Sequence, residues 1–161
     1  MDIIAEDLGF LTDSVLKLVK DTGYPGMKVL QFAFDSREDS DYLPHNYNSN
    51  CVVYTGTHDN NTVKGWYKEL AKKDKQFALS YLNNEKTEEE DIHWDYIRLA
   101  MGSVAYLCII PVQDYLGLGE EARINTPATL GTNWKWRMPA KALTKSLEKK
   151  IYDVTKLFAR L

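Results

Sequence analysis

Four short apolar runs, each ending in polar residues, are the feature that most constrains the fold of this chain. Helical or loop segments separate the runs, which read "DIIAEDLG", "MKVLQFAF", "CVVYTGTHD" and "VAYLCIIPVQDYL". Continuous apolar strands with helices between them are typical of a parallel sheet that is buried on both faces. The pattern therefore predicts an α/β fold, either an open doubly wound sheet or part of a (β/α)8 barrel. In both folds, chemistry gathers at the carboxyl ends of the strands.

Helical periodicity predicts four helices around these strands. The first follows Thr12 as its N-cap and ends at Gly23, where glycine suits the left-handed position after a helix. The second spans about 62–82 and the third about 92–103. The last is an amphipathic helix whose apolar residues recur at steps of three and four. These apolar residues are Leu143, Leu147, Ile151, Val154 and Leu157.

Composition and charge exclude several classes of function. The 161 residues suffice for one domain, or for a piece of a larger one. With 20 basic against 23 acidic residues and a net charge of −3, no basic stripe is available for nucleic acid. The longest apolar run, around 104–112, is too short to span a membrane, and we expect no signal peptide. Cys51 and Cys108 are expected as buried free thiols, so we expect a soluble, cytoplasmic protein.

Ionisable or amide side chains follow three of the four strands. They are the pairs Glu6-Asp7, His58-Asp59 and Gln113-Asp114. Two carboxylates that face each other across a pocket push their pKa values apart, so that one stays protonated as a general acid while the other stays ionised. That is the arrangement that glycosidic-bond chemistry requires. The alternative is that these residues are helix caps or solvated loop residues.

Other chemistries have less support. No glycine-rich phosphate loop follows any strand, which disfavours a dinucleotide or P-loop site. No His, Cys or acidic residues stand at a tight metal-ligand spacing, so we expect no metal and no cofactor. His45 lies beside a proline in a loop and His93 lies near a helix start, and neither indicates a site. Aromatic residues make up 12% of the chain, which suits a flat-faced ligand such as a sugar or, equally, a large aromatic core.

Five strings that follow one another along the chain are together very specific. They read "IIAEDLG", "GYPGMKVLQFAF", "YLPHNY", "VVYTGTHDNN" and "GTNWKWRM". In this order they resemble the amylomaltase family of 4-α-glucanotransferases, from about Ile3 to Met138. The resemblance implies that residues 1–161 are a single partial domain, the carboxyl-terminal half (strands 5–8 with helices) of a (β/α)8 TIM barrel of the α-amylase type. It also implies a retaining enzyme that passes part of an α-1,4-glucan to another sugar's 4-hydroxyl, with maltooligosaccharides as its partners.

The resemblance also implies roles for individual residues. Glu6 matches the family's general acid/base. Asp59 matches the carboxylate that holds sugar hydroxyls and stabilises the oxocarbenium-like transition state, and His58 matches a residue that hydrogen-bonds the same sugar. Phe32 matches a strand-end aromatic near the acceptor, and Asn125 lies in a loop that resembles a substrate-contacting loop of the family.

Some positions in the loop region leave alternatives open. Trp134 and Trp136 are either sugar platforms or packing residues under the substrate-contacting loop, and we expect packing. Asn61 stands where the family usually has Asp, and "NTPATLGTNW" differs from the usual pattern by small substitutions. Neither departure touches an assigned catalytic residue, so we expect them to affect the preference for acceptors more than the chemistry.

The family's nucleophilic Asp lies upstream of "AEDLG", in an Arg-x-Asp context. We therefore expect this chain to lack the nucleophile and to be inactive alone. It would then be part of a truncated or split enzyme that pairs with the missing amino-terminal half or with itself. A non-catalytic glucan-binding or interaction module is the alternative, and a hydrolase of the same clan is a weaker one.

Overall fold

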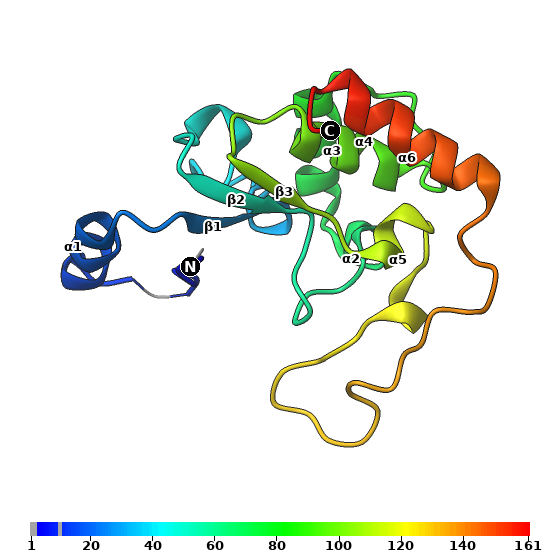
Figure 1. Cartoon of the computed structure of the whole chain (residues 1–161), viewed down its shortest axis with the longest axis horizontal. Helices are drawn as coiled ribbons and strands as arrows, with labels where there is room; N and C mark the ends of the chain where they lie inside the picture. Colours follow the sequence, from blue (N-terminus) through cyan, green and yellow to red (C-terminus); the bar gives the residue numbers. More distant parts are fainter. Residues whose placement is uncertain (1–2, 10) are drawn as a thin grey trace.

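The computed structural model describes residues 3–9 and 11–161 and centres on a three-stranded parallel sheet (Figure 1). The strands, in spatial order, are β1 (Gly26–Val29), β2 (Cys51–Tyr54) and β3 (Leu107–Ile109). In the central strand, Val52 pairs with Met27 of β1 and with Leu107 of β3. The predicted parallel α/β pattern is therefore confirmed for three of the four apolar runs.

Helices occupy most of the segments between and after the strands. The α-helices are α1 (Asp13–Thr22), α2 (Val63–Glu69), α3 (Lys72–Leu82), α4 (Ile92–Met101), α5 (Val112–Tyr115) and α6 (Lys145–Leu157). Three short 3-10 helices are η1 (Leu30–Phe32), η2 (Pro44–Asn46) and η3 (Glu120–Ala122). The predicted first, third and last helices are confirmed, and Gly23 ends α1 in the left-handed conformation. In the part of the chain that the structure describes, no helix is long and apolar enough to cross a membrane.

The main core lies between β2 and the helices α2, α3 and α4, and Phe34 is at its centre. The Phe34 ring lies 6.2 Å from the ring of Trp66 on α2 and 5.8 Å from that of Tyr81 on α3. A straight helix rises about 1.5 Å per residue, so fifteen residues would separate Trp66 and Tyr81 by about 22 Å. The prediction of one helix over 62–82 is wrong for this reason. The chain leaves the helical conformation at Leu70, and the two halves fold around one side chain.

The run "DIIAEDLG" forms no strand in its described residues, which corrects the prediction of four strands. It lies beside the start of β1, where the backbone N–H of Ala5 donates to the carbonyl oxygen of Pro25 at 2.9 Å. Pro25 has no N–H to continue a ladder. The N–H of Met27, two residues further on, donates to a carboxylate oxygen of Asp7 at 2.7 Å. A side chain thus occupies the position where a strand partner would bond.

Burial on both faces holds for the central strand but not for the edge strand β3. Val52 and Val53 of β2 have no exposed surface, whereas Leu107 and Ile109 of β3 are 40% and 37% exposed. Cys51 is a buried free thiol as predicted, and Cys108 is a free thiol that is only partly buried. One apolar face of β3 is therefore partly exposed among the described residues.

Candidate active site

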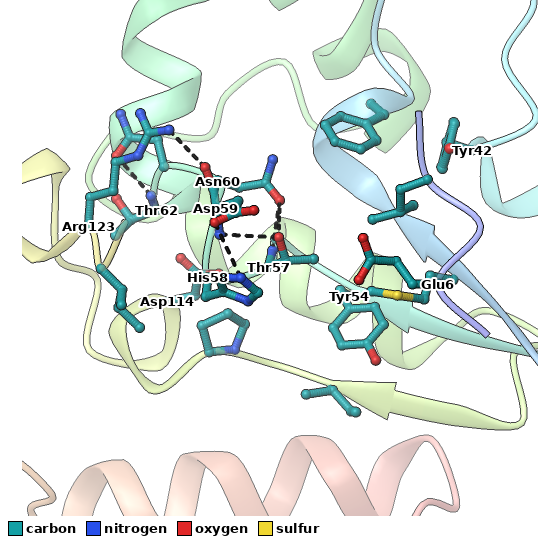
Figure 2. Close-up of a pocket in the computed structure, with 18 of the residues that line it drawn as sticks. Glu6, Tyr42, Tyr54, Thr57, His58, Asp59, Asn60, Thr62, Asp114 and Arg123 are labelled. Atoms are coloured by element: carbon teal, nitrogen blue, oxygen red, sulfur yellow. Dashed lines mark hydrogen bonds and ion pairs between the residues drawn. The ribbon is translucent and has the colours of Figure 1, made fainter. Parts of the chain in front are cut away.

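A cavity of about 910 Å³ opens at the carboxyl ends of the strands, within the size range of small-molecule sites (Figure 2). Its lining includes Glu6, His58, Asp59, Gln113 and Asp114. The structure therefore brings together residues from all three of the polar pairs that follow the predicted strands. We call residues 3–9 the Glu6 segment and residues 55–62 the Asp59 loop. Figure 2 shows Glu6 on one side of the cavity and His58 with Asp59 on the other.

The cavity lining is strongly acidic. Among the described residues that line it, Arg123 is the one lysine or arginine, against six carboxylic acids: Glu6, Glu38, Asp39, Asp41, Asp59 and Asp114. Such a surface repels phosphates and other anions and suits a neutral ligand that offers hydroxyl donors to carboxylate oxygens. Within residues 3–9 and 11–161, no three His, Cys, Asp or Glu side chains lie close enough together to hold a metal ion.

Two bonds to the start of β1 position the Glu6 segment. They are the Ala5 N–H to Pro25 bond and the Met27 N–H to Asp7 bond described above. Gly26 makes the second bond possible, because a Cβ at this position would lie 2.3 Å from the Asp7 carboxylate. The Glu6 side chain is exposed and makes no hydrogen bond or ion pair with the described part of the chain. Its carboxylate is thus presented to the cavity without a partner that fixes it.

The Asp59 loop carries a compact polar cluster. His58 Nε2 lies 3.2 Å from Asp59 Oδ1, and both side chains are about half exposed. Asn125 Nδ2 donates to the same Asp59 oxygen at 2.6 Å. Arg123 donates to the backbone carbonyl oxygens of Asp59 and Asn125, at 2.8 and 2.9 Å. The segment after η3 therefore binds the Asp59 loop, which lies more than sixty residues earlier in the sequence.

Beneath the loop, Asp114 is almost fully buried, with 2% of its surface exposed. Its two oxygens accept hydrogen bonds from the Thr55 hydroxyl at 2.5 Å and from the Val63 N–H at 2.8 Å. Burial raises the pKa of Asp114 to about 6, against the opposing effect of these two bonds, because a buried carboxylate loses its hydration. Asp114 is therefore a poorly solvated acid that accepts hydrogen bonds from the Asp59 loop and from the first residue of α2.

The aromatic candidates differ in their positions. Phe32 lines the cavity and packs edge-to-face on Tyr42 at 5.4 Å. Trp134 is 56% exposed, and its ring lies 5.2 Å from the His58 ring. Trp134 therefore does pack, but against the ring of His58 and with more than half of its surface exposed, so it is not buried under the loop. Trp136 is partly buried and lines a separate small polar cavity formed by residues 120–136.

The departure at Asn61 has a local explanation. The Asn61 side chain is buried, its oxygen accepts from the Thr62 N–H, and its amide lies 3.4 Å from a carboxylate oxygen of Glu69. Asp at this position would place two carboxylates against each other. The departure thus concerns a contact beside α2, although Asn61 also lines the cavity.

Sequence reasoning missed two residues that support the site. Gln31 is buried, and its amide donates to the backbone carbonyl of Asn61 at 2.8 Å. A polar residue within the apolar run "VLQFAF" is a signal that could have found it. Arg123 lies in a polar loop, and no pattern in the sequence distinguishes it from other surface arginines.

The chain contains one string, Arg37-Glu38-Asp39, with the Arg-x-Asp pattern that surrounds the family's nucleophile. It lies after η1, and Asp39 lines the cavity, but Arg37 is bound to Asp35 and both Glu38 and Asp39 are exposed. The string follows Glu6 along the chain, whereas the nucleophile implied by the resemblance precedes it. This string is therefore not counted as the nucleophile.

Comparison with known protein families gives one consistent result. A family model described as 4-alpha-glucanotransferase matches residues 1–144. A 4-alpha-glucanotransferase of Clostridium butyricum is 50% identical over 161 residues, which cover 99% of this chain and 33% of that protein. The chloroplastic/amyloplastic 4-alpha-glucanotransferase of Solanum tuberosum is 48% identical, over 100% of this chain and 28% of its own length.

Solved structures agree with the sequence comparisons. Amylomaltase from Streptococcus agalactiae, in complex with acarbose, superposes with a TM-score of 0.92 at 35% identity. The match covers 98% of this chain and 32% of that one. Amylomaltase from Corynebacterium glutamicum gives a TM-score of 0.69 at 17% identity, which shows a shared fold. The three-stranded α/β segment described above thus matches part of the amylomaltase structures.

Proposed function

The chain belongs to the family of 4-alpha-glucanotransferases, and on that premise we propose that it forms part of a site that transfers α-1,4-glucan segments between maltooligosaccharides. It spans about a third of the length of the relatives it matches. Residues 1–161 are, in this proposal, a single partial domain that supplies strands 5–8 of a (β/α)8 barrel of the α-amylase type. The Glu6 segment takes the place of the fifth strand. The chain together with the residues that complete the barrel is called the assembled enzyme below.

One observation carries the proposal. Glu6 and Asp59 line the same acidic cavity from opposite sides, at the strand ends where barrel enzymes do their chemistry (Figure 2). A neutral sugar that enters this cavity would have a carboxyl group on either side of its glycosidic bond. Retaining glycoside chemistry requires an acid/base on one side of the reacting bond and negative charge near the developing oxocarbenium ion.

Glu6 is the general acid/base of the proposed reaction. It donates a proton to the leaving glycosidic oxygen and then removes a proton from the incoming 4-hydroxyl. Between these two steps, the family's nucleophilic aspartate holds the glycosyl group as an ester. The resemblance puts that aspartate upstream of Glu6, so the assembled enzyme is required for turnover.

Asp59 stabilises the positive charge that develops on the sugar, and its oxygens accept bonds from sugar hydroxyls that tighten in the transition state. His58 lies against Asp59 and hydrogen-bonds the same sugar. Asn125 donates to one Asp59 oxygen at 2.6 Å, and this contact with the Asp59 carboxylate supports a role for Asn125 in binding the same sugar. Phe32, which lines the cavity and is 43% exposed, offers an apolar face to the acceptor.

A non-catalytic glucan-binding or interaction module is the second candidate. Its supporting observation is that the described chain is an open segment. Among the described residues, the outer strand β3 has β2 as its one neighbouring strand, and it exposes Leu107 and Ile109. Such edges pair with further chain, which would be the amino-terminal half of the barrel or a second copy. Turnover by the assembled enzyme distinguishes the first candidate from the second.

A cytoplasmic location is part of the proposal. Cys51 and Cys108 are free thiols, which persist in a reducing compartment. Burial raises the pKa of both thiols, that of Cys108 to about 11, so both are poorly reactive and carry no catalytic role here.

Incubation of the assembled enzyme with maltotriose tests the proposal. We expect glucose and longer maltooligosaccharides at a constant number of reducing ends, because transfer conserves glycosidic bonds. Glu6→Gln should lower the transfer rate by about 10²–10⁴-fold and leave maltooligosaccharide binding unchanged in calorimetry. Glu148→Gln on the exposed face of α6 is the control and should transfer at the parent rate.

Each other outcome has a definite meaning. A steady rise in reducing ends would indicate a hydrolase, and binding without turnover would indicate a binding module. Near-parent transfer by Glu6→Gln would contradict the acid/base role of Glu6.

A further inference from the structure

Asp114 binds both ends of the Asp59 loop with a single carboxylate. Thr55, whose hydroxyl donates to Asp114 at 2.5 Å, comes directly after β2. Val63, whose N–H donates at 2.8 Å, is the first residue of α2. All residues between them, including His58 and Asp59, lie in a loop whose two ends are thus held together.

A second buried side chain binds the same loop from the other side of β2, where β1 ends. Gln31, in η1 after β1, donates to the carbonyl of Asn61. Gly56 leaves room for this approach, because a Cβ there would lie 2.5 Å from the Gln31 amide nitrogen. The Asp59 loop is therefore hydrogen-bonded on both sides by buried polar side chains, Gln31 after β1 and Asp114 after β3.

A buried carboxylate is an expensive way to hold a loop in terms of stability. Hydrophobic residues of similar volume often stabilise a core more than buried charged groups do. Among the described residues, Asp114 has no ion-pair partner, and its carboxylate accepts hydrogen bonds from Thr55 and Val63. These bonds therefore serve the geometry of the Asp59 loop rather than a salt bridge.

We propose that Asp114 is a positioning residue that, through its bonds to Thr55 and Val63, fixes the Asp59 carboxylate where the transfer reaction needs it. This inference rests on the proposed function. Thr55 itself does not line the cavity, so a change at Thr55 reaches the reaction only through Asp114 and the loop. A misplacement of a reacting or stabilising group by about 1 Å is enough to slow a reaction by about 10²-fold.

The experiment compares Asp114→Asn, Thr55→Val and Thr55→Ser in the assembled enzyme with maltotriose as substrate. Asp114→Asn and Thr55→Val should each lower kcat by about tenfold or more while KM changes less than about twofold, because Asp59 acts mainly in the transition state. Thr55→Ser keeps the hydroxyl and should retain the parent kcat. The double variant Asp114→Asn/Thr55→Val should be no slower than the slower single variant, since both changes break one link.

Asp95→Asn is the matched control. Asp95 also accepts from a threonine hydroxyl at 2.5 Å, that of Thr87, and from an Asn84 amide, but it lies on α4 and does not line the cavity. It should lower the melting temperature without changing kcat. If Asp114→Asn does not fold, the isosteric Thr55→Val alone decides.

Parent kcat in Thr55→Val, or loss in Asp114→Asn and Thr55→Val no larger than in Asp95→Asn, would overturn the inference and leave the proposed function intact. Absence of transfer by the unsubstituted assembled enzyme would overturn the proposed function and the inference with it.

Discussion

The Glu6 segment and the Asp59 loop supply the two carboxylates that face the cavity, but the chain holds them to different degrees. Two bonds to the start of β1 anchor the Glu6 segment. The Asp59 loop is bound from three directions: by Gln31 after β1, by Asp114 after β3 and by Arg123 after η3. Asp59 itself accepts from Asn125, whereas Glu6 has no partner among the described residues.

This difference agrees with what each carboxylate has to do. A group that stabilises charge works best when its position is fixed before the reaction, since reorganisation then costs nothing. A group that first gives and then takes a proton must serve two oxygens in turn. We infer that the chain preorganises Asp59 by itself and leaves Glu6 to be placed by substrate and by the rest of the barrel.

The largest expected effect concerns stability at the Asp59 side. Asp114 has its pKa raised to about 6 from 3.8, so the folded state favours its neutral form. This contribution to stability is present in full below about pH 3.8 and is lost as pH rises through 6. It amounts to about 3 kcal/mol, from about 1.4 kcal/mol per pH unit between two pKa values. The free energy of unfolding of Asp114→Asn, measured with denaturant, should therefore rise relative to that of the parent by about this much between pH 4 and pH 7.

His93 provides the comparison for that measurement. Burial, with Lys64 and Lys150 nearby, lowers its pKa to about 4 from 6.5. Its contribution to stability is present above pH 6.5 and is lost as pH falls through 4, the opposite sign to Asp114. The free energy of unfolding of His93→Gln should thus rise relative to that of the parent as the pH falls. Equal pH profiles for the parent and Asp114→Asn would contradict the buried-acid account of the Asp59 loop.

The next effect concerns the weaker anchor. Gly26→Ala places a methyl group 2.3 Å from the Asp7 carboxylate, which must then leave the Met27 N–H. The Glu6 segment loses one of its two bonds, and kcat of the assembled enzyme should fall by roughly 10- to 100-fold. Gly26 is buried at the start of β1, so thermal unfolding is measured beside kcat to separate loss of the anchor from loss of the fold.

Asp7→Ala tests the same link from the other side. It should cause a similar loss of kcat, and the double variant should lose no more than the slower single one. A large fall in melting temperature with unchanged kcat would show that this contact supports the sheet rather than Glu6.

Three of the strands and the edge of the sheet that carries the site were predictable because their signals are local. An apolar run that ends in His58 and Asp59 reads as a strand followed by a site at its carboxyl end. The break at Leu70 was not predictable, since it depends on two helices folding around Phe34, far away in the sequence. The missing first strand depends likewise on a side chain, Asp7, that takes the donor of a neighbouring strand.

The site divides in the same way. Motifs that stand beside one another in the sequence identified Glu6, His58 and Asp59. The residues that support them act across the fold: Asp114 bonds to groups 59 and 51 residues away. A single sequence gives no information about such pairs, and only the packed structure reveals which acids are buried and what they hold.

A smaller effect is expected at Arg123, which binds the Asp59 loop from the segment after η3. Arg123 binds two carbonyl oxygens, those of Asp59 and Asn125, with different nitrogens of its guanidinium group. Lysine is a single point donor and cannot reproduce this fork. Arg123→Lys should lower kcat by about tenfold at most, because Asp114 and Gln31 still hold the loop.

Arg137→Lys is the matched control for this variant. Arg137 also binds two carbonyl oxygens in the same part of the chain, those of Trp134 and Trp136, but it does not touch the Asp59 loop. It should leave kcat at the parent value. Equal losses of kcat in the two variants would mean that the segment after η3 matters because it is ordered, and not because Arg123 contacts Asp59.

The smallest effect is expected where the Asp59 side is most exposed. The Trp134 ring lies 5.2 Å from that of His58 at an interplanar angle of 36°, and such pairs contribute about 0.5–1.5 kcal/mol. Trp134→Leu should therefore raise KM for maltotriose about threefold with little change in kcat, while Trp136→Leu, at a residue of the separate polar cavity, should change neither. If Trp134 instead contacts sugar directly, the loss should grow with the length of the maltooligosaccharide, because each added glucose can reach the open indole face. A loss that is the same for maltotriose and maltoheptaose would assign Trp134 to the support of His58 alone.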